Sequence, residues 1–284
     1  MKRRFRGSRL NGAIAGTLFV GAVLYSEVSR ARHTEEQRIT DDTAYTLNKY
    51  QARVGLWKAQ YAPFKNFHAG LYHWPWLFRV ANLHAKWTFY ADDPLSFATS
   101  LGFFYLDTSR FPKKEGQDSD AKVVFSVVPF DVITSYRFGD RFTLSGGVVY
   151  TVVKARGEGD PDVIEGFIEG GVDNLQLVST LEWRVSEVTA FTLHGRYLLL
   201  QSADAITDST FHPDDFTTVE LVAAGSSNNL NFEKAGSVTP GVVFSWDVFN
   251  LRFGLSIGNY NVPAINFVLP TALVVPELDL YWVW

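Results

Sequence analysis

The side chains best suited to catalysis in this sequence are the serine of a Gly254-Leu255-Ser256-Ile257-Gly258 motif and six histidines, because the chain contains no cysteine. In hydrolases a G-x-S-x-G motif lies on a sharp turn from a strand into a helix, which exposes the serine. This motif instead lies inside an alternating segment and leads into residues 259–263, which cannot start a helix. We therefore interpret its glycines as small residues that relieve crowding on the inner side of a curved strand.

The histidines have no spacing that would bind a metal ion. None belongs to an H-E-x-x-H motif or to another closely spaced pair, and His68 and His73 are expected on opposite faces of a strand. A lipid-modifying barrel enzyme would need a serine beside a histidine near the outer rim, and neither His84 nor His194 has one. We predict no catalytic residue, no metal site and no cofactor.

Charged residues at every second position of apolar segments form a more informative pattern. Between residues 174 and 185, leucines and Trp183 alternate with polar residues that include Glu182 and Arg184. Successive side chains of a strand point to opposite faces, so the alternation predicts strands with one apolar and one polar face. The residues expected on the polar face, either as an ion-pair network or as a charged constriction, are Lys86, Asp131, Glu182, Arg184, His194, Arg196, Glu220, Arg252 and Asp279.

Two architectures share this alternation: a soluble β-sandwich, whose apolar face points inward, and a membrane barrel, whose apolar face points outward. Three features favour the barrel. The segments 122–138 and 141–154 reach the ~9–11 residues that cross a bilayer at a tilt, and aromatic residues recur near strand ends. The charged residues of the polar face could not fill a dry core without costly pairing. We therefore predict an all-β fold, a single antiparallel transmembrane β-barrel.

Twelve strands are expected, with ten to fourteen as the range, because bacterial barrels have even strand numbers. If 139–140 and 186–187 are periplasmic turns, however, the twelfth strand ends outside the cell. Either one strand is miscounted around 202–236, or residues 40–50 contribute another. The predicted strands are 52–60, 66–73, 82–91, 95–107, 122–138, 141–154, 173–185, 188–201, 216–225, 239–247, 250–259 and 275–284.

The first 31 residues have the layout of a secretory signal peptide: a basic start, an uncharged run over 10–25, and Ser29-Arg30-Ala31 before the expected cut. An uncleaved anchor helix is the alternative. Residues 32–43 are predicted as a periplasmic lead-in and 44–284 as the barrel. Removing 1–31 takes away six basic residues and Glu27 from a chain of net charge −4, which leaves −9. Such a chain is a poor partner for nucleic acid.

The last residues, Leu278-Asp279-Leu280-Tyr281-Trp282-Val283-Trp284, resemble the final strand of Gram-negative outer-membrane β-barrel proteins. That strand alternates hydrophobic residues and ends in an aromatic residue, usually Phe, where this chain has Trp284. The resemblance implies a location in the bacterial outer membrane, with outer-membrane lipids and the barrel-assembly machinery as partners. Leu280, Trp282 and Trp284 would form the assembly signal.

A barrel of about twelve strands lies between those whose interior is filled and those with an open channel. The function we expect is a narrow pore for small hydrophilic solutes, with a lumen of mixed charge. The alternatives are a closed structural or surface-interaction barrel, a lipid-modifying barrel enzyme, and a soluble secreted β-protein.

Overall fold

The computed structural model describes residues 39–108, 122–158, 164–211, 219–227, 235–246, 248–262 and 267–284, without the side chains of residues 158, 164–168, 203–211, 219–227, 260, 262 and 267–271. The described part is one large β-sheet with a short helix, α2 (His73–Leu77). No described helix has the length and apolar character needed to cross a membrane. The strands are β1 (Ala52–Gly55), β2 (Lys58–Phe64), β3 (Phe67–Tyr72), β4 (Ala81–Asp92), β5 (Leu95–Asp107), β6 (Lys122–Phe138), β7 (Phe142–Glu158), β8 (Ile164–Arg184), β9 (Thr189–Phe211), β10 (Val219–Ser227), β11 (Gly236–Trp246), β12 (Phe249–Val262) and β13 (Phe267–Val283).

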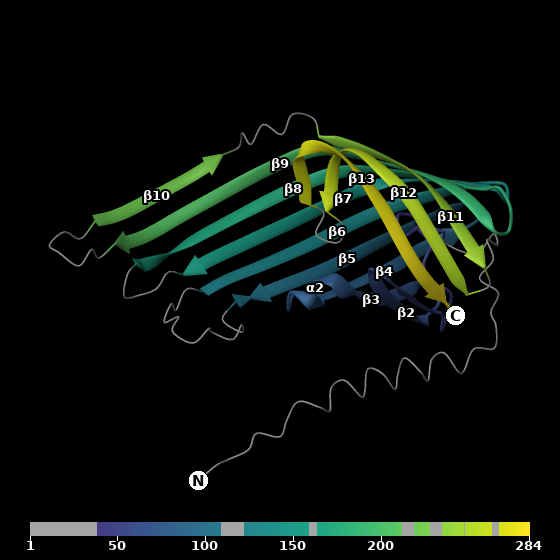
Figure 1. Cartoon of the computed structure of the whole chain (residues 1–284), viewed down its shortest axis with the longest axis horizontal. Coiled ribbons are helices and arrows are strands. Elements are labelled where there is room, and N and C mark those ends of the chain that lie inside the picture. Colours follow the sequence, from purple (N-terminus) through teal and green to yellow (C-terminus); the bar gives the residue numbers. More distant parts are fainter. Residues whose placement is uncertain are drawn as a thin grey trace, which may run out of the picture.

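The sheet closes on itself as an antiparallel barrel (Figure 1). Strands β1 to β9 follow one another around the wall, β11 to β13 complete it, and β13 pairs with β1. This last seam is short, since only Arg53, Val54 and Gly55 of β1 pair with β13. The predicted all-β antiparallel barrel is confirmed, and its wall has twelve strands.

Strands β10 and β11 are two halves of one wall strand. β10 pairs with residues 203–211 of β9, and β11 pairs with residues 189–197 of β9. Because both are antiparallel to β9, they run in the same direction, one after the other along β9. The prediction of 216–225 and 239–247 as successive strands of opposite direction is therefore wrong, and the miscount lies around 202–236.

The predicted strand 52–60 is also wrong, because it contains two strands. Leu56 and Trp57 separate β1 from β2. Buried side chains fall at odd positions in β1, starting with Arg53, and at even positions in β2, starting with Lys58. The division of 52–60 adds one strand to the predicted set, and the joining of β10 with β11 removes one. The count therefore stays at twelve, but the first and the last strand run opposite to the predicted direction.

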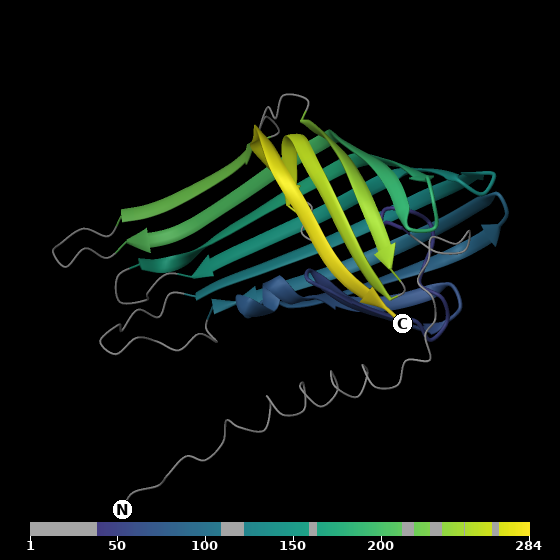
Figure 2. The ribbon, with the colours of Figure 1, turned by 45° about the vertical axis from the view of Figure 1, so that its right-hand side comes forward.

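The barrel has a turn end and a loop end (Figure 2). The turn end holds the tight connections β4–β5, β6–β7, β8–β9 and β11–β12, and the loop end holds α2. The C-terminus lies at the turn end, because Trp284 exchanges backbone hydrogen bonds of 3.0 and 2.8 Å with Ala52. The strand count from the sequence placed the chain end opposite the short turns, whereas in the structure both lie at the same end of the barrel.

The apolar side of the wall points outward and the polar side points inward. Leu177, Leu193 and Phe253 are 44%, 45% and 50% exposed, whereas Glu182 is fully buried and Arg184 is 4% exposed. This is the reverse of a soluble sandwich, in which the leucines would be packed together and the charges would lie in water.

The wall is much taller on one side than on the other. β8 and β9 have 21 and 23 residues, whereas β1, β2 and β3 have four, seven and six. In Figure 1 the strands β6 to β10 reach far past the ends of β12 and β13 at the loop end. The tall side continues for about ten residues per strand beyond the length that a tilted membrane strand needs.

The motif around Ser256 lies within the regular pairing of β12 with β13 rather than at a strand-to-helix turn. Gly258 has a positive φ of 118°, and a Cβ there would lie 2.2 Å from the carbonyl oxygen of Gly236. The glycine therefore permits a close backbone approach where β12 bends, as the sequence interpretation proposed.

Candidate functional site in the barrel lumen

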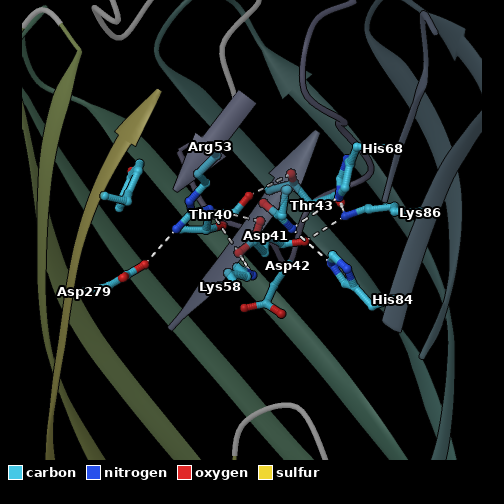
Figure 3. A network of polar contacts seen from close by, with 12 residues as sticks. Thr40, Asp41, Asp42, Thr43, Arg53, Lys58, His68, His84, Lys86 and Asp279 are labelled. Atoms are coloured by element: carbon cyan, nitrogen blue, oxygen red, sulfur yellow. Dashed lines mark hydrogen bonds and ion pairs between the residues drawn. The ribbon is translucent and has the colours of Figure 1, made fainter. Parts of the chain in front are cut away.

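Residues 39–47, which we call the plug, lie inside the barrel near its turn end (Figure 3). Ile39, Thr40, Ala44 and Leu47 are at most 5% exposed. The plug has no regular secondary structure, and its apolar residues fill the gap between the strands. Ile39 packs with Ala190 and Val243, and Leu47 packs with Ala62, Tyr281 and Val283.

The plug includes residues on both sides of residue 43, where the sequence predicted the boundary between the lead-in and the barrel. Residues 32–43 were expected ahead of the barrel, but the described part of that segment, 39–43, is in the barrel interior. No structural boundary separates residue 43 from residue 44. Residues 1–38, with the predicted signal peptide, lie outside the described residues.

Backbone groups and hydroxyls of the plug are satisfied by wall side chains. The Thr40 N–H and hydroxyl both donate to Glu182 Oε1, at 2.8 and 2.7 Å. The Ala44 N–H donates to Ser135 Oγ at 2.7 Å, and its carbonyl accepts from Thr88 Oγ1 at 2.6 Å. Since the plug forms no ladder, these side chains replace the hydrogen bonds that a sheet would provide.

Asp41 is held by two cations of the short strands (Figure 3). Arg53 Nη1 lies 3.2 and 3.1 Å from the two carboxylate oxygens, and Lys58 pairs with one of them. Arg53 Nη2 reaches Asp279 Oδ2 at 2.7 Å, and its guanidinium lies over the Tyr281 ring at 3.8 Å. Arg53 thus ties the plug to both strands of the β1–β13 seam.

Asp42 faces a second basic group, on β9. Its carboxylate oxygens lie 3.5 Å from His194 Nδ1 and 3.5 Å from Arg196 Nη2. The Arg196 Nε–H donates to His194 Nε2 at 2.8 Å, which places the proton of a neutral ring on Nδ1, facing Asp42 and the Thr180 hydroxyl. Burial by itself raises the pKa of Asp42, but the charges of His194 in its protonated form and of Arg196 and Arg252 outweigh it and hold that pKa well below the usual 3.8.

Lys86 and a group of histidines complete the polar interior. Lys86 Nζ donates to the carbonyl oxygens of Asp41, at 2.7 Å, and of Thr43. Gln60 Nε2 lies 3.4 Å from His68 Nε2 and 3.0 Å from His84 Nε2. His68 and His73 were expected on one strand. His68 lies on β3, but His73 begins α2.

A cavity of about 390 Å³ lies beside the plug within the lumen. Basic and acidic groups both line it, among them Lys58, Arg196, Arg252, Asp131 and Glu277. Its remaining lining includes Phe104, Ile133, Val149 and Val178. The cavity is of the size that binds small molecules, and its polar groups come from opposite sides of the barrel.

The structure brings most of the predicted polar-face residues to the interior. Lys86, Glu182, Arg184 and His194 are buried, and Arg252 pairs with Glu277 at 3.6 Å. Asp131 contacts Ser100, and Asp279 and Arg196 reach the groups described above. The side chain of Glu220, on β10, lies outside the described residues.

The residues without a predicted role in the barrel are the plug carboxylates, Asp41 and Asp42, and the Asp41 partner Arg53. Asp41 and Asp42 have no alternating neighbours, so no pattern assigned them to the barrel. The available signal was electrostatic: an acidic pair directly precedes a segment whose inward face carries more basic than acidic residues.

The residues of the predicted assembly signal lie on the last strand. Trp282 points outward, 43% exposed, and its ring lies 5.3 Å from that of Phe249. Trp284 ends the chain beside β1, and Leu280 accepts a backbone hydrogen bond of 2.8 Å from Leu56.

Among the described residues, no group of three or more histidine, aspartate or glutamate side chains is arranged to hold a metal ion. A scan against models of protein families found no match, and a search of curated proteins found none either.

Proposed function

We propose that the chain is an outer-membrane β-barrel protein whose wall crosses the bilayer. The apolar outer face supports this proposal. Along β8, the nine residues from Leu175 to Trp183 carry outward leucines over ~27 Å of strand, which at a tilt of ~35–45° covers ~19–22 Å of the ~25 Å apolar band of membrane barrels.

An aromatic row at the turn end supports the same proposal. Phe142, Trp183 and Phe191 have successive ring centroids 5.6 and 5.8 Å apart, and Trp246 and Phe249 lie 5.8 Å apart. Aromatic rings gather at the membrane–water interfaces of barrels. In this orientation the short turns and Trp284 are periplasmic, and α2 and the tall side of the wall lie outside the cell.

Within the membrane we propose a narrow pore for small hydrophilic solutes, closed at its periplasmic end by the plug. The cavity carries this proposal: charged groups of both signs line it, it lies in the lumen, and it ends on a segment held by side-chain contacts rather than by strand pairing. Solutes would pass when the plug leaves its position, and the charges of both signs would select among them.

A closed structural barrel is the second candidate. The number of hydrogen bonds and ion pairs on Thr40, Asp41, Asp42 and Ala44 favours it, because a plug held so firmly leaves no path. Both candidates share the fold and differ in whether the plug can be displaced.

Single-channel recording in planar bilayers distinguishes them. We expect brief, rare openings from the full-length protein, and long openings from E182A, which removes the acceptor of both Thr40 hydrogen bonds. The matched control is E187Q, an exposed substitution in the β8–β9 turn. Silent membranes with both wild type and E182A, from protein shown to be folded by circular dichroism, would refute the pore and leave the structural barrel.

A further inference from the structure

We propose that the lumen contains a binding site for a small dicarboxylate and that Asp41 and Asp42 occupy it as an internal substitute for that solute. This inference rests on the proposed pore, and it names the class of solute that the pore would select.

The wall residues around the plug carry an excess of positive charge when Asp41 and Asp42 are not counted. The described wall residues that pair with Asp41 or Asp42, that interact electrostatically with Asp42, or that pair with Arg53 carry a net charge of +2 with neutral histidine. Asp41 and Asp42 supply the compensating −2, and the buried Glu182–Arg184 pair adds no net charge. These wall residues are Arg53, Lys58, Lys86, Arg196 and Arg252, against Asp131, Glu277 and Asp279.

The basic groups form two subsites, each of which holds one carboxylate. Arg53 and Lys58 hold Asp41 from β1 and β2, and His194 and Arg196 hold Asp42 from β9. A single phosphate could fill only one of these subsites. A molecule with two carboxylates on a short linker could fill both, as the adjacent aspartates do.

Burial makes the site dependent on an anion. Arg53 is 5% exposed and the Arg196 side chain 18% exposed, so water reaches these cations poorly. Uncompensated charges in such surroundings are costly, and an anion from solution would be drawn to them once the aspartates leave or lose their charge. The low pKa of Asp42 keeps its carboxylate ionised in the site across the physiological pH range.

The cavity gives a dicarboxylate a route to the same groups. Lys58, Arg196 and both plug aspartates line its wall. A solute in the cavity is therefore next to the cations it would bind, and it would compete with the plug for them.

Calorimetric titration of the full chain in detergent micelles with succinate tests the proposal. We expect D41N/D42N to bind succinate at least tenfold more tightly than wild type, and at least tenfold more tightly than it binds butyrate. D92N/D140N, which removes two exposed carboxylates at the turn end, is the matched control and should behave as wild type.

Three results would overturn the proposal: equal succinate affinity in wild type and D41N/D42N, binding of phosphate by the variant as tightly as succinate, or binding of Ca²⁺ in place of succinate. If the double variant does not fold, D42N leaves the Asp41 contacts in place. Acetate should then raise the melting temperature of D42N and not that of wild type, and an equal effect on both overturns the site.

The outcome is separable from that of the pore. A variant that binds succinate and passes no current in bilayers supports the site and refutes the pore. A variant that passes current and binds no succinate supports the pore and refutes the site.

Discussion

Replacing Leu177 by lysine tests the direction of the apolar face most directly. Leu177 lies on the outer face of β8, six residues from the aromatic ring of Trp183, and is 44% exposed. If that face meets hydrocarbon, a lysine there costs about 2–4 kcal/mol of folding free energy, as near the midplane of other barrels. If it meets water, the substitution costs less than about 0.5 kcal/mol.

The assay is urea unfolding in phospholipid vesicles, followed by tryptophan fluorescence. The matched control is V185K, on the same face but in the β8–β9 turn, where a lysine near the interface costs about 0–1 kcal/mol. Equal midpoints for L177K and V185K, together with a chain that stays soluble without detergent, would refute the membrane assignment.

Three further predictions concern the plug and the bend of β12. E182A should destabilise the fold by about 3–5 kcal/mol, because it removes the buried carboxylate that accepts both Thr40 hydrogen bonds and lies 3.9 Å from Arg184 Nη2. E182Q keeps an acceptor oxygen and should cost less, and urea unfolding measures both. The folded-state pKa of Asp42 is lowered, so the stability that its carboxylate contributes is complete above the usual pKa of 3.8 and is lost as the pH falls through the folded-state pKa. Wild type should therefore lose stability below about pH 4 more steeply than D42N, as measured by acid titration with circular dichroism. G258A should cost more than about 1 kcal/mol, since an alanine at that positive φ meets the Gly236 carbonyl, whereas G139A, at a turn with open space, should cost less than G258A.

The faces of the long strands could be predicted because their alternation is regular over most of their length. In β8 and β9 most outward apolar residues alternate with inward polar residues, so Leu177 and Leu193 were assigned to one side and Arg184 and His194 to the other. The physical cause is the two-residue period of a strand, which needs no information from distant residues.

The strand boundaries failed where local chemistry gave no signal. Leu56 and Trp57 form a turn with the single glycine Gly55 before it, and the change of inward parity between Arg53 and Lys58 is the further mark. The halves β10 and β11 share a direction, and direction is set by pairing with β9 rather than by their own residues.

The plug could not be predicted from periodicity at all. Its position depends on contacts with residues far along the chain, such as the 142-residue separation between Thr40 and Glu182. Contacts of this kind are visible only after the wall has closed. The site was therefore half predictable: its wall followed from alternation, and its occupant did not.

The three-residue pairing between β1 and β13 has a consequence for assembly. Even with the flanking backbone hydrogen bonds of Ala52 and Leu56, this seam covers only residues 52–56 of the N-terminal side, and Arg53 supplements it by joining Asp41 to Asp279 across the junction. Arg53 thus contributes both to the closure of the barrel and to the docking of the plug. Loss of Arg53 would weaken both at once.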